Sequence, residues 1–257
     1  VLTLSGTNTY SGGTTISAGT LKVNNATALG ANGGAVSVTA GAVLDLNGIT
    51  MTNTNALTLN GTGISTNGAL INSSSTGATY AGLITLGSAS SIVGGTGTIA
   101  ITNVGTISGT YGLTLGGAQG GSITSIIGTS TGTLTKQDAG TWTLSGANTY
   151  TGLTTVSAGT LAYGRNDAIS TGAVTVNGST AVLALGTYTD SVGAVTLTAG
   201  SITGTGSSTQ GVLTSTSGFT LNPATGVTVS ASANLAGTVN LTHSGAGTAN
   251  LSGYNAY

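Results

Sequence analysis

Short apolar triplets, in which two apolar residues flank a third residue, recur along the whole chain and constrain the fold more than any other feature. Leu21-Lys22-Val23, Leu57-Thr58-Leu59 and Val174-Thr175-Val176 are three of them. Alternation with a period of two is typical of β-strands, and no segment shows the 3.6-residue period of a helix. Gly, Asn, Ser and Ala fill the gaps, as they do in turns. The sequence therefore predicts an all-β fold with many very short strands.

Longer repeats are superimposed on the triplets. Leu4–Leu21 is repeated further along the chain as Leu144–Leu161, and Leu134–Tyr150 is repeated as Leu241–Tyr257. The number of residues between the two copies differs from one pair to the other, which indicates that short units were inserted or lost between copies. Self-similarity over the whole length favours a solenoid, in which each coil contacts only its neighbours. We expect residues 1–257 to form one continuous segment, cut from a longer array, with repeat signatures starting near residues 4, 144 and 251.

Two architectures accommodate many short strands: an antiparallel sandwich or barrel, and a parallel β-helix. The triplets are shorter than usual barrel strands. Asn-Gly pairs such as Asn47-Gly48 and Asn177-Gly178 do not recur at a regular hairpin spacing. We therefore predict a right-handed parallel β-helix (β-solenoid) with the apolar triplet residues inside and the intervening Thr and Ser facing water. At about 20–25 residues per coil, the chain makes roughly ten to thirteen coils.

The composition excludes several functional classes. The chain has three Lys or Arg residues and four acidic residues, a net charge of −1, no Cys and a mean hydropathy of +0.36. Nucleic-acid binding needs several basic contacts to phosphate, disordered chains combine low hydropathy with high charge, and thiolate metal sites need Cys. The sequence shows neither a signal peptide nor an apolar stretch long enough to span a membrane, so we expect any export signals to lie outside this chain.

The run LSGTNTYSGGTTISAGTL at Leu4–Leu21 and its copy LSGANTYTGLTTVSAGTL at Leu144–Leu161 resemble the autotransporter-associated β-strand repeat. Ala78–Ile92 and Ser191–Gly206 are similar to the material that lies between such signatures. The resemblance implies a secreted β-helix passenger segment displayed on the bacterial cell surface. A complete autotransporter also has a signal peptide and a C-terminal translocator barrel. This sequence shows neither a signal peptide nor a series of amphipathic barrel strands, so it departs from the complete pattern.

The few charged residues offer one candidate chemical site. β-Helix enzymes that act on polysaccharides use clustered carboxylates, and the best candidate cluster is Arg165, Asp167 and Asp190, whose two acids lie about one coil apart. A loop with solvated charges is the simpler interpretation. The remaining acids, Asp45 and Asp138, lie elsewhere in the sequence. His243 aligns with Lys136 in the other repeat copy, which predicts a surface turn, and no catalytic, cofactor or metal site is predicted.

Two repeated polar patterns have both structural and functional interpretations. Aromatic residues occupy one repeat position, with Asn two residues before each: Tyr10, Tyr150 and Tyr257 follow Asn8, Asn148 and Asn255. A glycan-stacking patch and a turn covered by Tyr both fit, and we favour the turn because the copies lie about five coils apart. Thr-x-Thr runs such as Thr7-Asn8-Thr9 and Thr141-Trp142-Thr143 suggest ice binding, but they do not recur once per coil.

We therefore expect a non-enzymatic structural segment of a secreted bacterial surface protein, acting as a rigid stalk, spacer or fibre unit. Low charge and uncapped ends predict end-to-end or lateral self-association. The alternatives are an adhesin that binds glycans or a host surface, a polysaccharide-degrading enzyme and an ice-binding solenoid. No nucleic acid, cofactor or membrane insertion is expected.

Overall fold

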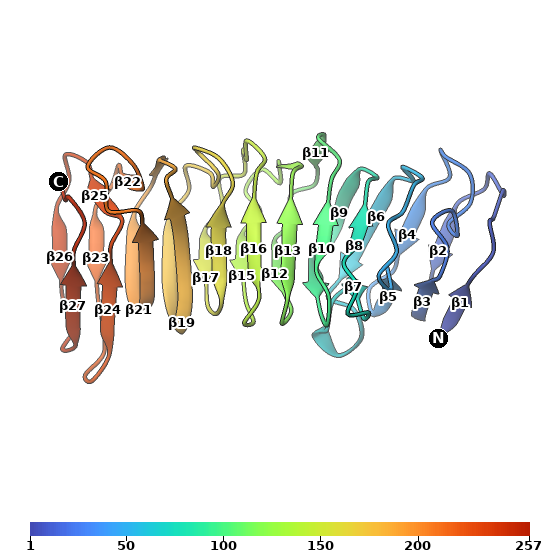
Figure 1. Cartoon of the computed structure of the whole chain (residues 1–257), viewed down its shortest axis with the longest axis horizontal. Helices are drawn as coiled ribbons and strands as arrows, with labels where there is room; N and C mark the ends of the chain where they lie inside the picture. The colour runs from blue at the N-terminus through green and yellow to red at the C-terminus, as the bar shows by residue number, and fades with distance from the viewer.

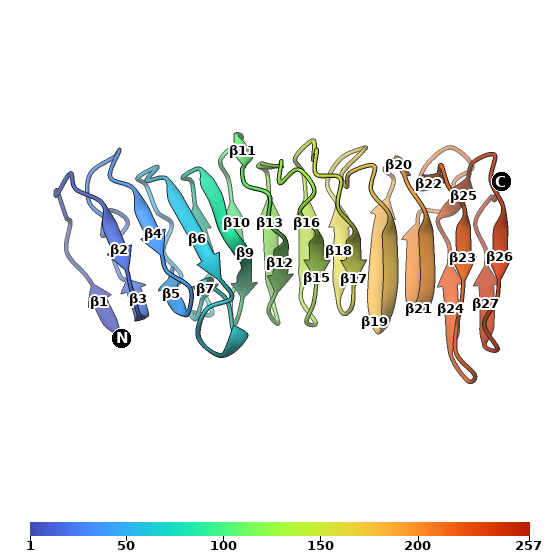
Figure 2. The same cartoon turned by 180° about the vertical axis from the view of Figure 1, so that it is seen from behind.

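The computed structural model describes all 257 residues and is a rod of coils stacked along its long axis. The N-terminal strand lies at one end of the rod and the last strands at the other (Figure 1; Figure 2 shows the opposite side). The strands pair in parallel, and the only helical element is a single 3₁₀ turn, η1 (Ile64–Thr66). The predicted all-β solenoid is confirmed, with about 11 turns.

Each complete coil has three sides, which we call face 1, face 2 and face 3 in chain order. Face 1 contains β2 (Thr14–Ile16), β4 (Val36–Val38), β6 (Leu57–Gly61), the first part of β9 (Ile84–Gly94), β11 (Thr106–Ile107), β14 (Ile126–Ile127), β20 (Asp190–Val192), β22 (Val212–Ser215) and β25 (Asn234–Ala236). Face 2 contains β1 (Leu2–Leu4), β3 (Gly19–Val23), β5 (Ala42–Asp45), β7 (Leu70–Asn72), the second part of β9, β12 (Leu113–Gly116), β15 (Leu134–Lys136), β17 (Thr154–Val156), the first parts of β19 (Val174–Gly186) and β21 (Val195–Gly204), β23 (Phe219–Leu221) and β26 (Leu241–His243). Face 3 contains β8 (Ala78–Tyr80), β10 (Ile99–Ile101), β13 (Gly120–Ile123), β16 (Thr141–Leu144), β18 (Thr160–Tyr163), the second parts of β19 and β21, β24 (Thr228–Ala231) and β27 (Thr248–Leu251).

Face 2 is an unbroken ladder of strands from β1 to β26. The interval along the chain between paired residues is shortest for Leu2 with Leu21 and longest for Leu44 with Leu70. The triplet apolar side chains point inward and form one cluster of 52 buried residues that runs through the coils. Because each coil buries its apolar residues only against its neighbours, the core is a continuous column rather than a globular centre.

The two copies of the first long repeat lie on different faces. Thr14–Ile16 lies on face 1, whereas its copy Thr154–Val156 lies on face 2. The other pair of copies, Leu134–Lys136 and Leu241–His243, share face 2. The second pair is therefore separated by a whole number of coils, and the first pair is not.

The change of face occurs between β9 and β12. Ile84-Thr85-Leu86 lies on face 1. The next triplet with a central threonine, Leu113-Thr114-Leu115, lies on face 2. Three strand segments separate these triplets (the second part of β9, β10 and β11), whereas two, β13 and β14, separate β12 from β15. The apolar-Thr-apolar triplets thus move by one third of a coil, while successive strands continue to follow faces 1, 2 and 3 in order.

Candidate functional site

Outward-facing threonines form an in-register ladder on face 2. The middle residues of seven consecutive strands pair with one another: Thr114, Thr135, Thr155, Thr175, Thr196, Thr220 and Thr242. On face 1 the corresponding ladder consists of Thr15, Ser37, Thr58, Thr85 and Ser108. These side chains are half-buried or exposed, which confirms that Thr and Ser between apolar residues face water. Sequence reasoning missed the ladder because it considered Thr-x-Thr runs, whereas each coil contributes one central threonine.

The repeated Tyr and Asn residues have structural roles in the copies. Tyr10 and Tyr150 each hydrogen-bond the threonine four residues later, with hydroxyl separations of 2.8 and 2.7 Å. Asn148 links adjacent coils by accepting from Ile127 N–H at 2.6 Å and donating to Ala168 O at 2.6 Å. Asn8 similarly donates to Ala28 O at 2.8 Å, and Asn255 accepts from Leu235 N–H at 3.1 Å. The contacts favour the turn interpretation, since the three tyrosines do not form one patch.

Of the predicted cluster Arg165, Asp167 and Asp190, the structure brings Asp167 and Asp190 close together. Asp167 N–H donates to Thr189 O at 2.9 Å, which places the 165–167 loop over the start of β20. The Arg165 Nε donates to Asn166 O at 2.9 Å, and Arg165 makes no ion pair with either acid. Asp167 is exposed and has a φ of 53°, a turn conformation that Asp tolerates. The two carboxyl groups therefore lie in unlike settings, with no cation between them.

Asp190 is buried beneath this loop. Its Oδ2 accepts from Ile169 N–H at 3.1 Å. Burial raises the pKa of the Asp190 carboxyl to about 6, and the nearby Asp167 carboxylate contributes to the rise. The buried phenol of Tyr163 faces this carboxyl, and its hydroxyl makes no hydrogen bond of standard geometry. The group is a buried carboxyl at the rim of the core, and it has neither an open cleft nor a basic partner for substrate chemistry.

Lys136 is fully buried, so the surface turn expected for this position is wrong. Its side chain points inward from β15, and the ammonium donates to Gln137 O at 2.7 Å, Asp138 O at 2.6 Å and Ala158 O at 2.8 Å. Desolvation lowers the pKa of Lys136 to about 8. Three carbonyls satisfy all three ammonium donors, which is why a cation can stand where neighbouring coils have Leu or Val. His243, its aligned residue, is exposed on β26.

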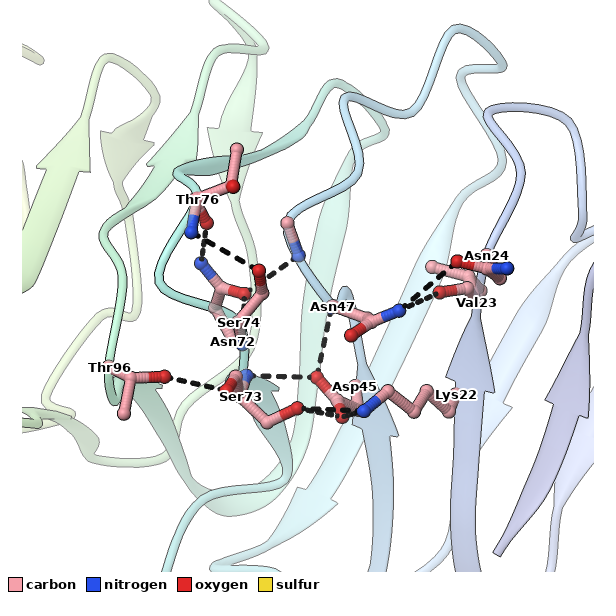
Figure 3. Close-up of polar contacts among 11 residues, drawn as sticks. Lys22, Val23, Asn24, Asp45, Asn47, Asn72, Ser73, Ser74, Thr76 and Thr96 are labelled. Atoms are coloured by element: carbon pink, nitrogen blue, oxygen red, sulfur yellow. Dashed lines mark hydrogen bonds and ion pairs between the residues drawn. The ribbon is translucent and has the colours of Figure 1, made fainter.

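A polar network joins three coils near the N-terminal end of the rod (Figure 3). Asp45 Oδ2 accepts from Ser73 Oγ at 2.6 Å and lies 3.7 Å from Lys22 Nζ, which is the only ion pair in the structure. Asp45 Oδ1 accepts from the N–H groups of Asn47 and Ser73 at 2.9 and 3.1 Å. The carboxylate is therefore fully engaged in linking coils, and it is not free to act on a substrate.

The buried amide of Asn72 continues this network toward the next coil (Figure 3). Its Oδ1 accepts from Gly48 and Ser74 N–H groups at 2.8 and 3.2 Å, and its Nδ2 donates to Thr76 and Thr98 O at 2.8 and 3.0 Å. All four hydrogen-bonding positions of the amide are thus used. Asn72 fixes the turn between faces 2 and 3.

A groove follows this same edge, between faces 2 and 3, across four coils. Its volume is about 650 Å³, against 320 Å³ for the apolar hollow beside β1 at the N-terminal end. Ile71 and Val93 contribute apolar side chains, and Asn67, Thr96 and Asp138 contribute polar ones. Gly95 and Gly117, which lie in two Gly-rich segments, form part of the groove wall. Sequence reasoning did not find the groove, because its residues are far apart in the chain.

No group of three or more His, Cys, Asp or Glu side chains is arranged to hold a metal ion. The structure also has no helix with the length and apolar character needed to cross a membrane.

Comparisons with known proteins agree with the repeat pattern. No curated protein and no solved structure matches the chain. The family described as passenger-associated-transport-repeat matches residues 1–23 and 134–162. These segments include both copies of the LSG-x-NTY signature. The match confirms that the chain carries the repeat of autotransporter passenger regions in these two segments.

Proposed function

We propose that the chain is a non-enzymatic structural segment of a secreted bacterial surface protein, where it acts as a rigid spacer or stalk. The observation that carries this proposal is the unbroken face 2 ladder, which joins the coils from β1 to β26 over one continuous core. At about 4.8 Å per coil, 11 turns span about 50 Å. The passenger repeat supports display outside the cell.

The spacer role is testable by changing the number of coils. We would display the chain on a bacterial surface between an outer-membrane anchor and an epitope tag. Thr155 and Thr175 are paired on face 2, so removing residues 155–174 deletes one coil and lets Thr175 take the place of Thr155. The deletion should shorten the reach of the tag by about one coil spacing and leave display intact. The spacer role would be contradicted if neither the unmodified nor the shortened chain were displayed, or if removal of the coil left the reach of the tag unchanged.

The proposal includes association at the ends of the rod. β1 pairs only with β3, β26 only with β23 and β27 only with β24, so the outer strands present unpaired backbone groups. Exposed edge strands pair readily with other strands. We infer that these edges pair with those of a second copy of the chain. Sedimentation of the purified chain as a concentration-independent monomer would rule out pairing between copies.

The enzyme alternative has a direct test at the Asp167 and Asp190 cluster. Activity on a polysaccharide that disappears in Asp167→Asn or Asp190→Asn would establish it. The burial of Asp190 and the orientation of Arg165 favour the structural role.

A second candidate function is ice binding, and the seven-threonine ladder of face 2 is the observation that favours it. β-Branched threonines have restricted side-chain rotamers, so an in-register column presents its hydroxyls at the regular strand spacing. Thermal hysteresis at micromolar protein that is lost in Thr155→Leu and Thr175→Leu variants would establish this function. Absence of hysteresis would eliminate it.

A further inference from the structure

The groove between faces 2 and 3 owes its shape to a departure from the regular coil. The coil that runs from Leu44 in β5 to its partner Leu70 in β7 is the longest on face 2, because it contains the loop Thr62–Gly68 with its 3₁₀ turn η1. The loop projects from the rod beside β7 (Figures 1 and 2). Asn67, near the end of the loop, contributes to one side of the groove.

This loop is held in a defined conformation. Gly68 N–H donates to Thr62 O at 2.8 Å, and Gly63 and Gly68 form a bridge that closes the loop. Ser65 and Thr66 have φ values of 51° and 63°, which cost non-glycine residues free energy. Asp138, across the groove, also has a positive φ of 61°. Such conformations persist where the surrounding structure enforces them, so both sides of the groove are preorganised.

The groove combines apolar surface with a few unused polar groups. Ile71 and Val93 are half-buried, and no aromatic ring lines the groove. The Asn67 side chain makes no hydrogen bond within the chain, and Asp138 uses only Oδ2, which accepts from Gly117 N–H at 2.8 Å. Thr96 Oγ1 donates to Ser73 O at 2.6 Å and keeps its acceptor capacity. Apolar surface with a small number of convergent polar groups is typical of ligand sites.

The charges around the groove select the class of ligand. Lys22 is paired with Asp45, the Lys136 ammonium is enclosed by three carbonyls, and Arg165 lies away from the groove. No free cation is therefore available for a phosphate, sulfate or carboxylate group. The absence of aromatic rings removes the usual cage for quaternary ammonium ligands. The remaining chemistry suits an uncharged molecule with many hydroxyls and apolar C–H faces.

We propose that this groove binds a neutral oligosaccharide that lies along the rod axis. The ligand's hydroxyls donate to Asp138 Oδ1 and Thr96 Oγ1 and exchange hydrogen bonds with the Asn67 amide, while its C–H faces contact Ile71 and Val93. The groove crosses four coils, so its length is about three strand spacings, or ~14 Å. The inference rests on the proposed role at the cell surface. It adds to that role a site by which the stalk adheres to glycans.

The test is binding of the whole chain to an array of neutral, uronic-acid and sialylated oligosaccharides, followed by calorimetry with the best neutral ligand. Asp138→Asn and Asn67→Ala should each weaken binding about tenfold. Asp167→Asn is the matched control, since Asp167 is an exposed, positive-φ aspartate outside the groove and its replacement should leave affinity unchanged. Circular dichroism melting of each variant separates lost binding from lost folding.

Three outcomes would overturn the inference: no neutral oligosaccharide binding at millimolar concentration, preference for acidic oligosaccharides, or equal affinity in Asp138→Asn, Asn67→Ala and the unmodified chain. Each differs from failure of the spacer role. A chain that is displayed as a rod and binds no glycan refutes the groove alone. A chain that binds neutral glycans but fails the coil-removal test refutes the spacer role alone.

Discussion

The two copies of the long repeat, Leu4–Leu21 and Leu144–Leu161, are nearly identical in sequence and differ in their surroundings. Both form the same local turn, with the Tyr hydroxyl bonded to the threonine four residues later. Tyr10 is 39% exposed, whereas Tyr150 is completely buried. The copies also lie on different faces. The repeat sequence therefore specifies the turn, and the neighbouring coils determine how deeply its side chains are buried.

The largest difference is expected from removal of the tyrosine ring. Tyr150→Ala should lower the free energy of unfolding by about 4 kcal/mol, because a buried aromatic leaves a cavity, and Tyr10→Ala by about 1 kcal/mol. Urea denaturation of both variants measures the two losses. Equal losses would show that the local turn, rather than the surrounding coils, sets the contribution of this position.

Glycine gives the next contrast at a second repeat position. A Cβ added to Gly152 would overlap the carbonyl oxygen of Gly132, whereas one added to Gly12 would meet nothing within 4 Å. Gly152→Ala should therefore cost about 2 kcal/mol through overpacking against backbone, and Gly12→Ala should be nearly neutral. Thermal melting followed by circular dichroism provides the comparison. A well-folded Gly152→Ala protein with an unchanged Tm would contradict the close approach of these coils.

Asp190 lies beside the second copy and not the first, and its buried carboxyl makes the stability of the fold depend on pH there. Its folded pKa of about 6 exceeds the ordinary pKa of 3.8, so the folded state binds the proton more tightly than the unfolded chain. Stability from this group is therefore fully present below about pH 4 and is lost as pH rises through 6. The loss should be on the order of 1–2 kcal/mol, reduced from the full linkage value by partial solvent screening.

Asp190→Asn should abolish that loss and raise Tm at pH 7 relative to the unmodified chain. Asparagine suits the position, because Asn148 and Asn255 accept the same kind of inter-coil N–H bond that Asp190 accepts from Ile169. Melting curves between pH 4 and 8 provide the measurement, and Asp167→Asn should reduce the loss without abolishing it, because Asp167 contributes to the raised pKa of Asp190. Parallel pH profiles for Asp190→Asn and the unmodified chain would show that another group titrates.

The smallest contrast concerns the hydroxyl ladders. Thr155 pairs with a threonine on both sides, Thr135 and Thr175, whereas Thr15 pairs only with Ser37. Thr155→Ala should cost up to about 1 kcal/mol, and Thr15→Ala about half as much, because cross-strand pairs stabilise sheets by fractions of a kcal/mol each. Hydrogen exchange at the flanking amides can resolve this difference. A larger effect at Thr15 would indicate that neighbouring strands do not set the contribution.

The strand pattern, the coil count and the inward and outward residues could be predicted from the sequence, because they depend on local alternation. The triplet Leu134-Thr135-Lys136 shows where this reasoning stops. Alternation from the inward Leu134 also points residue 136 inward, but a charged side chain does not fit that apolar pattern, and its three carbonyl partners come from its own turn and from Ala158 in the next coil. Its alignment with His243 suggested a surface position instead.

The groove and the change of face have the same origin in long-range geometry. Asn67 and Asp138 line one groove only because four coils stack in a particular register. The change of face between β9 and β12 leaves no unusual residue in the sequence. It shows only as an interval from Ile84 to Leu113 that is longer than the interval from Leu113 to Leu134. Strand register was needed to interpret that difference.

The change of face between the repeat copies has a consequence for how such rods evolve. A solenoid whose sides are built alike accepts an insertion of a single strand and turn, and the core closes again around it. Everything downstream is then rotated about the axis by one side of the rod. One short genetic insertion can therefore redirect a binding edge or a hydroxyl strip toward a different neighbour, without altering any residue of the strip itself.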